Sequence, residues 1–348
     1  MIGAGIIGLS MAIDLRKRGM SVLVVEKGEP GREASWAAGG MLADFPLGMP
    51  VALRDLAEAS ARRYPDFVSE LEAESGIRID LRVEGTLVFG GEEHETLAAE
   101  HPLPGPLHEL EPGLRAPAQA PVCLYLKERS VDPRELLAAA IGAARQLGVE
   151  FSCGEAVVGI ETSEGGASGV RTPRSTFSSG IVVNCAGAWA GQIGAGQLGA
   201  AIPTRPVKGQ MLCLAVDERG SVRHVVRPPD VYLIPRSDGR LVVGATQEEA
   251  GFDKQVVPET IQRLQQAAID LVPGLSDAPV LESWAGLRPG TPDKLPILGR
   301  ASLPGYFVAT GHFRDGILLA PVTARVMGQL ICGEKPEIEL GAFGAGRF

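Results

Sequence analysis

The sequence predicts an α/β fold in which a parallel-sheet domain is interleaved with a second, antiparallel α+β domain. A glycine-rich β-α-β pattern lies at the N-terminus, and the patterns at 181–184 and 306–331 resemble pieces of the same kind of domain. Strand-rich segments that begin near Gly85 and Val207 separate these pieces. Alternating strands and helices are typical of a parallel sheet, whereas strands joined by tight turns form antiparallel ones.

The N-terminal pattern is a glycine fingerprint for a dinucleotide. Gly3 permits the tight turn, Gly5 lets backbone N–H groups approach a pyrophosphate, and Gly8 lets the helix pack closely on the strand. The helix expected at Ile6–Arg18 would direct the partial positive charge of its N-terminus towards the phosphates.

The strand expected at 22–25 leads into Glu26, about twenty residues after the last glycine of the fingerprint. A carboxylate there can accept hydrogen bonds from an adenosine ribose. Its charge also disfavours a 2′-phosphate, which argues against NADP.

The first strand of the sheet is nearly absent, because only Met1 and Ile2 precede the fingerprint. Losing a central strand would open the core beneath a cofactor, so we expect the reading frame to begin further upstream, or another segment to fill the gap. A secretory signal is not expected, since no basic segment comes first and Asp14 and Arg16 soon interrupt the apolar stretch.

Bulk properties exclude several classes of protein. The net charge of −9 argues against nucleic acid as a partner, and no stretch of 18 apolar residues could span a membrane. The five cysteines form no CxxC pair and lie among apolar residues, so we expect buried free thiols and a reducing cytoplasm; they are Cys123, Cys153, Cys185, Cys213 and Cys332. The five histidines have no metal-binding spacing, and no metal site is predicted.

The remaining patterns predict further elements. Asp132-Pro133 is a typical N-cap and first helical residue, and Ser283–Asp293 is expected to be a polar loop in an apolar frame. Other helices are expected at 51–75, 134–147, 258–271 and 317–331, and other strands at 85–89, 149–151, 157–160, 232–236, 241–244 and 306–309. The proline-rich region 90–121 predicts no clear element.

Five longer motifs make the chain resemble a known family. They are SWAAGGML at 35–42, PVKG at 206–209, YLIPR at 232–236 with GRLVVGAT at 239–246, WAGLRPGT at 284–291 and GHFRDGILLAP at 311–321. Nearly the whole chain is similar to the FAD-dependent amino-acid oxidase family, and within it to the glycine oxidases of thiamine biosynthesis.

The resemblance implies a Rossmann-like FAD-binding domain in three segments, interleaved with an antiparallel substrate domain over the flavin. We expect residues 1–82, 129–202 and 286–348 to form the FAD-binding domain, and 83–128 and 203–285 the substrate domain. It also implies a homo-oligomer of the tetrameric kind.

Three residues are identified as candidate catalytic groups. Arg288 is similar to the family arginine that anchors the substrate carboxylate, for which its planar fork suits a bidentate pair. Tyr232 resembles the hydroxyl that completes this site, and Arg314 a second arginine at the substrate end of the flavin. The alternatives are a loop arginine bound to backbone carbonyls, a tyrosine that packs in the core, and a surface or helix-capping arginine.

The resemblance also implies a set of cofactor-binding residues. The ADP half is expected on the glycine fingerprint and the 35–41 stretch along the ribityl chain and flavin ring. The helix after Gly316 is expected to aim its N-terminus at the flavin's pyrimidine edge. The full set is Gly3, Gly5, Ile6, Ile7, Gly8, Glu26, Lys27, Ser35, Ala37, Ala38, Gly40, Met41, Val157, Ala186, Gly187, Trp189, Gly286, His312, Arg314, Asp315, Gly316 and Ile317.

Two positions depart from the family pattern, and they leave the preferred amine open. Gln247 stands where a family methionine lines the small-substrate pocket, and Pro229 lies near the place of a family histidine. Relatives with covalent flavin attach it to a cysteine near the C-terminal site. The nearest here, Cys332, is at the far end of the last helix, so we expect non-covalent FAD.

The expected reaction is the FAD-dependent oxidative deamination of glycine or a similar small amine. A hydride would pass from Cα to flavin N5, giving an imine, and oxygen would reoxidise the flavin to yield hydrogen peroxide. The imine would feed the thiazole branch of thiamine synthesis.

Three alternatives stay open. One is a D-amino-acid or sarcosine-type dehydrogenase with another electron acceptor. A second is a nicotinamide-dependent dehydrogenase, which the N-terminal fingerprint alone permits. A third is a flavin-free binding protein disabled by the short first strand.

Overall fold

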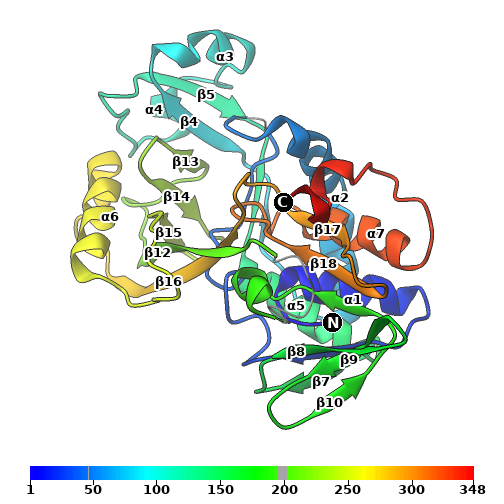
Figure 1. Ribbon diagram of the computed structural model, residues 1–348. Helices are drawn as coiled ribbons and strands as arrows, with labels where there is room; N and C mark the ends of the chain where they lie inside the picture. The colour runs from blue at the N-terminus through cyan, green and yellow to red at the C-terminus, as the bar shows by residue number, and fades with distance from the viewer. Residues whose placement is uncertain (46, 194–201) are drawn as a thin grey trace.

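The computed structural model describes residues 1–45, 47–193 and 202–348. Figure 1 shows a helix-rich layered part, which holds the N-terminus, beside a part built on one large sheet. The predicted α/β fold class is confirmed.

A largely parallel sheet, with one antiparallel pair of strands at an edge, organises the first part. Its strands follow the order β7-β1 and β11-β18-β17, and Ile2 joins the two groups through parallel bridges to Val25 and Asn184. The short N-terminal segment thus occupies the central position between β1 and β11. The strands are β1 (Leu23–Glu26), β7 (Glu150–Cys153), β11 (Val182–Asn184), β17 (Ile297–Arg300) and β18 (Tyr306–Thr310).

Helices cover one face of this sheet and a small antiparallel sheet covers the other. The helices share an apolar core with Val24, Val183 and Phe307 on the strands. They are α1 (Ile6–Lys17), α2 (Arg54–Ser75), α5 (Pro133–Gln146) and α7 (Ala320–Ile331). The opposite face packs Val25 and Val308 against β8 (Gly159–Ser163), β9 (Gly166–Arg171) and β10 (Thr176–Ser178).

The second part is a seven-stranded sheet in the order β16-β12-β15-β14-β13-β4-β5. Its strands are β4 (Thr86–Gly90), β5 (Val122–Leu126), β12 (Arg205–Ala215), β13 (Val225–Arg227), β14 (Tyr232–Pro235), β15 (Arg240–Gly244) and β16 (Val280–Gly290). Residues alternate between the two faces of a strand. Leu212 and Leu233 therefore pack with helix α6 (Pro258–Leu271), whereas Met211 and Tyr232 face the first part.

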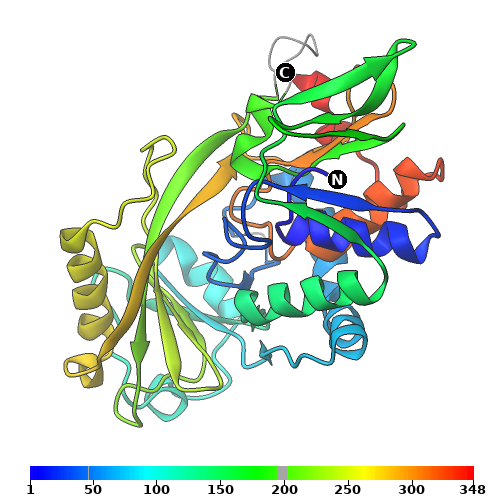
Figure 2. The ribbon, with the colours of Figure 1, turned by 90° about the horizontal axis from the view of Figure 1, so that it is seen from below.

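Two long strands, β12 and β16, connect the two parts. They pair antiparallel from Arg205↔Gly290 to Leu214↔Val280, with one irregularity after Cys213. Figure 2 shows the paired strands running from beside α6 towards the helix-rich layers. The expected domain boundary between 285 and 286 falls inside β16, and residues 194–201 before the other boundary lie outside the described part.

Shorter elements complete the fold. A three-stranded sheet in the order β2-β6-β3 lies along the connection between the parts. Its strands are β2 (Met41–Leu42), β3 (Leu81–Arg82) and β6 (Arg129–Val131). The short helices are α3 (Glu95–Glu100) and α4 (Leu107–Leu110), with 3-10 helices at Val51–Leu53, Glu92–His94, Gly187–Gln192, Pro273–Leu275, Gly341–Phe343 and Ala345–Arg347.

The expected loop at Ser283–Asp293 is the clearest error of the sequence analysis. Residues up to Gly290 form the second half of β16, because β12 supplies hydrogen-bond partners on one side that no local pattern announces. Pro289 and Gly290 obscured the strand, since both residue types are rare inside sheets.

Two smaller expectations were also wrong. The last helix begins at Ala320 rather than Ile317, with Pro321 in its first turn, where a missing N–H costs nothing. Cys153 and Cys332 are exposed rather than buried, because each lies at the end of its element. The predicted N-cap is confirmed: Asp132 accepts hydrogen bonds from the N–H groups of Arg134 and Glu135.

Candidate functional site

A cavity of about 950 Å³ lies between the parallel sheet and the seven-stranded sheet. Nearly every residue predicted for cofactor or substrate lines it. From the cofactor set these are Gly3, Gly5, Ile6, Ile7, Glu26, Lys27, Ser35, Ala37, Ala38, Gly40, Met41, Val157, Ala186, Gly187, Trp189, Gly286, His312, Arg314, Asp315, Gly316 and Ile317, and from the candidate catalytic groups Arg288 and Tyr232.

Gly8 is the one predicted residue that does not line the cavity, and its role is in packing. A Cβ on Gly8 would lie 2.1 Å from the backbone oxygen of Gly3, so no larger residue fits without moving the turn. Gly3 has a φ of +95°, and a Cβ there would lie 2.7 Å from the backbone oxygen of Cys185. Both glycines hold helix α1 close to the turn after Ile2.

The N-terminus of α1 opens into the cavity without an acidic side chain in its first turn. Ser35 reaches across and accepts a hydrogen bond from the Ile6 N–H at 3.0 Å. The carboxylate of Glu26 accepts from the N–H groups of Ala4 at 2.8 Å and Gly28 at 3.0 Å. These contacts hold together the turn at residues 3–5, the end of β1 at Glu26 and the start of α1 at Ile6. We call this group of residues the dinucleotide cradle.

Side chains from the large sheet hold the small-residue segment 37–40 against the cavity. The Trp284 indole N–H donates to the Ala37 backbone oxygen at 3.1 Å, and Arg236 donates to the Gly39 backbone oxygen at 2.6 Å. A Cβ on Gly40 would lie 2.0 Å from the Val131 backbone oxygen. The small residues therefore allow two sheets to approach the cavity wall closely.

Lys27 and Trp189 form part of the wall at another end of the cavity. The Lys27 ammonium lies 3.1 Å from the centre of the Trp189 ring and 2.8 Å from a Glu33 carboxylate oxygen. A cation over an aromatic face and an ion pair together hold this side chain at the cavity wall.

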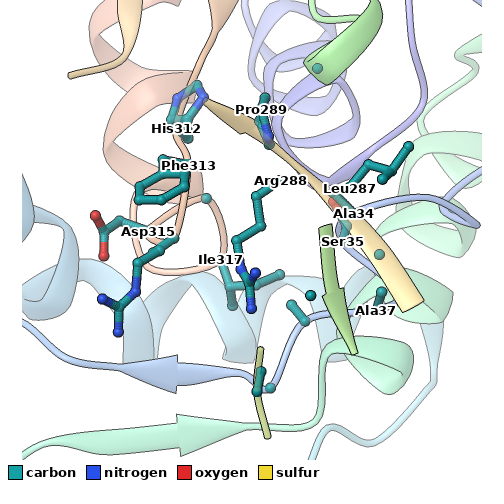
Figure 3. Close-up of a pocket in the computed structure, with 18 of the residues that line it drawn as sticks. Ala34, Ser35, Ala37, Leu287, Arg288, Pro289, His312, Phe313, Asp315 and Ile317 are labelled. Atoms are coloured by element: carbon teal, nitrogen blue, oxygen red, sulfur yellow. The ribbon is translucent and has the colours of Figure 1, made fainter. Parts of the chain in front are cut away.

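Arg288 projects from β16 into the cavity. Figure 3 shows it between the segment that carries His312 to Ile317 and the segment that carries Ala34 to Ala37. Its Nη1 donates to the backbone oxygens of Thr246 at 3.0 Å and Lys208 at 3.4 Å. In the described part of the chain no carboxylate forms an ion pair with Arg288. The guanidinium is held in place by carbonyls but keeps its charge and donors for a ligand.

Tyr232 lies next to Arg288 on the cavity face of β14. Burial raises the pKa of its hydroxyl, while Arg288 and Arg314 act in the opposite direction. The phenol therefore stays protonated at neutral pH and can donate a hydrogen bond. A Cβ on Gly244, its neighbour on β15, would lie 2.6 Å from the Tyr232 ring, so the glycine makes room for the phenol.

The segment before α7 closes the cavity with three polar residues. His312 is buried, its Nε2 lies 3.1 Å from the Thr323 hydroxyl, and burial lowers its pKa to about 3, so it is neutral. Burial raises the pKa of Asp315 to about 6, against the effect of neighbouring Arg314. Arg314 is exposed at the cavity edge and, within the described residues, has no ion-pair partner.

Several cavity residues escaped the sequence analysis. Gly209 and Thr246 lie in motifs that carried the family resemblance, so a signal was present. Arg227 and Met211 had no such signal. The two departures from the family pattern, Gln247 and Pro229, both line the cavity. Further lining residues include Glu33, Gly39, Phe45, Val88, Glu93, His94, Asp230, Ala245 and Phe313.

The residues present fit a flavin dinucleotide. The cradle has no side chain on Gly3 or Gly5, a helix N-terminus whose N-cap residue has no side chain, and the Glu26 carboxylate at the strand end. The same cavity is lined by the 35–41 segment and by Arg288, which gives a dinucleotide and a small acid room in one space.

Other kinds of site find no support in the described residues. In residues 1–45, 47–193 and 202–348, no cluster of three or more histidines, cysteines or acidic residues is arranged to hold a metal ion. Within the same ranges, none of the helices combines the length and apolar character needed to cross a membrane.

Comparisons with known proteins agree with this geometry. Glycine oxidase from Pseudomonas aeruginosa is 33% identical, over 97% of this chain and 96% of its own. The crystal structure of glycine oxidase from Geobacillus kaustophilus superposes with a TM-score of 0.92 at 31% identity, covering 100% of this chain and 97% of that one.

A third relative is longer. The bifunctional protein ThiO/ThiG of Trichormus variabilis is 34% identical over 100% of this chain but only 54% of its own length, so the chain spans about half of that relative. Residues 1–330 match the family described as FAD dependent oxidoreductase. The chain belongs to this family of FAD-dependent oxidoreductases.

Proposed function

We propose that this protein oxidatively deaminates glycine or a similar small amine with FAD as cofactor and oxygen as acceptor. The observation that carries the proposal is the position of Arg288, which points into the cavity between the His312–Ile317 and Ala34–Ala37 segments and has no carboxylate partner among the described residues (Figure 3). The names of the similar proteins point to the same substrate. The imine product would serve the thiazole branch of thiamine synthesis.

The residues around Arg288 suit an amino-acid carboxylate. The guanidinium can pair with it bidentately, and the protonated Tyr232 hydroxyl can donate a further hydrogen bond. Because Thr246 and Lys208 carbonyls already fix the guanidinium, less conformational entropy is lost on binding. Arg288 and Tyr232 would therefore fix the position of the substrate Cα.

Bound FAD would supply the oxidation by accepting a hydride from the substrate Cα at N5. The chain contributes orientation and charge. Arg314 at the cavity edge adds positive charge, while the buried and neutral His312 adds none. The amine can lose its proton to solvent, so no side-chain base at Cα is needed.

We extend the proposal to non-covalent FAD. Cys185 lines the cavity, but burial raises its pKa to about 12, so the nucleophilic thiolate is disfavoured. Cys332 lies beyond the last residue of α7, with its sulfur 3.8 Å from that of Met20. Acid precipitation should release the flavin into the supernatant, and yellow colour in the pellet would contradict non-covalent binding.

Three further features complete the proposal. We propose a cytoplasmic enzyme, a homo-tetramer in solution, and FAD-binding and substrate domains at the boundaries expected from the sequence. Light scattering on the purified protein tests the tetramer, and a measured mass of one chain would contradict it.

The decisive test is the visible spectrum of the purified protein under anaerobic conditions, before and after glycine is added. Bleaching of the flavin by glycine, and recovery with hydrogen peroxide on admitting air, is the expected result. Bleaching followed by recovery only with a dye would identify a dehydrogenase. A flavin that no small amine bleaches would refute the proposed function.

A further inference from the structure

A row of residues crosses the cavity face of the seven-stranded sheet. Strand β13 pairs with β14 through Val226↔Leu233, which places Arg227 directly opposite Tyr232. On its other side, Arg227 pairs with Val88 of β4. Arg227, Tyr232 and Val88 all line the cavity. Arg227 is thus the neighbour of Tyr232 on the side away from Arg288.

Arg227 is only partly neutralised. Its Nη1 lies 3.4 Å from a Glu128 carboxylate oxygen, and that is its one ion pair within the described residues. A guanidinium has five N–H donors in a fork, so a single long contact leaves most of them available. The side chain is 17% exposed, which fits a group at the wall of an open cavity.

Glu128, the counter-ion of this arginine, makes only one long contact with it. It is 3% exposed, and its Oε1 is buried without a hydrogen-bond partner. Burial raises the pKa of Glu128, although Arg227 opposes this effect. Hydrogen bonds from the Thr86 side chain and the Phe45 backbone also act on this carboxyl, so Glu128 is stabilised by other groups besides Arg227.

Other charged residues near this end of the cavity are more exposed to water. The Glu93 side chain is 72% exposed and accepts a hydrogen bond from the Gly91 N–H, with His94 Nδ1 also 3.1 Å from its carboxylate. Asp230 is exposed as well. Their charges are screened by solvent and salt, whereas Arg227 acts from a drier position.

We propose that Arg227 binds a second acid group of the substrate, so that the cavity accepts amines with two acid groups in addition to glycine. The proposal rests on the proposed function, because Arg288 and Tyr232 must hold the first carboxylate. Its substrate class is the dicarboxylic amines: glycine extended by a carboxymethyl group on nitrogen, or an amino acid with an acidic side chain.

The spacing suits such a molecule. Adjacent strands lie about 4.8 Å apart, and side chains directly opposite each other have Cβ atoms about 5 Å apart. Two carboxylates separated by three or four bonds can therefore reach Tyr232 with Arg288 at one end and Arg227 at the other. Glycine, with one carboxylate, would leave Arg227 unused.

The competing interpretation is that Arg227 only stabilises buried Glu128. Removing the arginine alone would then leave an unpaired buried carboxylate, and kcat/KM would fall by the same factor for every substrate. The double variant Arg227→Met/Glu128→Gln separates the two interpretations, because it removes both charges.

The experiment compares kcat/KM for iminodiacetate, glycine and both enantiomers of aspartate in the FAD-loaded protein. The variants are Arg227→Met, Arg227→Lys, Arg227→Met/Glu128→Gln and, as a matched control, Arg223→Met, whose exposed side chain does not line the cavity. We expect Arg227→Met and the double variant to lower the iminodiacetate-to-glycine ratio about ten- to hundredfold, which corresponds to one charge-assisted hydrogen-bonded contact. Arg227→Lys should recover part of the ratio, and Arg223→Met should not change it.

Several results would overturn the proposal. If the double variant restores the ratio, or if Arg227→Met lowers turnover of both substrates equally, Arg227 acts through Glu128 alone. If the parent protein is bleached by glycine but by no dicarboxylic amine, the second acid site is absent and the proposed function stands. If neither class bleaches the flavin, both proposals fail.

Discussion

The guanidinium of Arg288 lies directly over the α-carbon of Gly209 on the adjacent strand. A Cβ at position 209 would lie 2.3 Å from Nη1 and 2.4 Å from Nη2. The pairing Gly209↔Gly286 on β12 and β16 brings a second glycine to the same place. The absence of a side chain on β12 is therefore what lets the arginine lie flat against the sheet.

Gly209→Ala should weaken substrate binding while leaving FAD bound. The new methyl group displaces the guanidinium from the Thr246 and Lys208 carbonyls, so the bidentate geometry is lost, and we expect KM for glycine to rise about tenfold or more. Steady-state kinetics on protein with a normal flavin spectrum measures this. Gly180→Ala, where a Cβ meets nothing within 4 Å, is the control. An unchanged KM would show that Arg288 adapts to the methyl group.

Arg288→Lys should lower kcat/KM by about ten- to hundredfold even though the charge is retained. A lysine ammonium is a point charge that cannot form the two parallel hydrogen bonds of a guanidinium. The flavin spectrum and thermal unfolding midpoint should stay close to those of the parent, because the backbone hydrogen bonds of Arg288 are to the Lys208 and Thr246 carbonyls and Arg288 is not part of the dinucleotide-binding turn. A variant with parental KM and kcat would remove Arg288 from the substrate site.

Gly8→Ala should reduce both stability and FAD content. Its methyl group would overlap the Gly3 backbone oxygen, and overpacking of this kind costs about 1–3 kcal/mol. Shifting the turn also moves the helix N-terminus away from the pyrophosphate. Thermal unfolding and the ratio of flavin to protein absorbance measure the two effects. Gly28→Ala, with open space around the new methyl group, is the control and should match the parent.

The buried His312 should make stability depend on pH. Its folded-state pKa of about 3 lies below the ordinary 6.5, so the unfolded chain takes up this proton more readily. Its contribution is fully present above pH 6.5 and is lost as the pH falls towards 3, by about 1.4 kcal/mol per pH unit at most.

His312→Gln isolates this effect, because glutamine keeps a hydrogen-bonding group for Thr323 and does not titrate. Urea midpoints of the FAD-loaded parent and variant at pH 7.5 and 5.5 give the comparison. We expect the parent to lose more stability than the variant over this interval. Parallel losses in both proteins would mean that His312 is protonated in the folded state.

The sequence predicted local features well and long-range pairings poorly. The fingerprint from Gly3 to Glu26 and the Asp132 N-cap are set by residues that are neighbours in the chain, so pattern and structure agree. Strand β16 was missed because its partner β12 lies more than sixty residues away, while Pro289 and Gly290 argue locally against a strand.

The same reason explains which cavity residues were found. Arg288, Tyr232 and the cofactor set came from motifs, whereas Arg227 has no motif and reaches the cavity only through the register of β13 with β14. Arg227 lies beside Tyr232 only because of the register in which β13 pairs with β14. A shift of β13 by one residue would place the Arg227 side chain on the other face of the sheet.

The residue that we propose as the anchor for the substrate carboxylate lies within a paired β-strand rather than in a loop. Backbone pairing with β12 flanks Arg288 on both sides along β16, so small loop movements cannot change where its guanidinium points. New substrates would then be gained by exchanging single residues along the neighbouring strands, each of which presents one side chain to the same space. Specificity in this architecture can change one strand at a time, while the oxidation chemistry stays fixed.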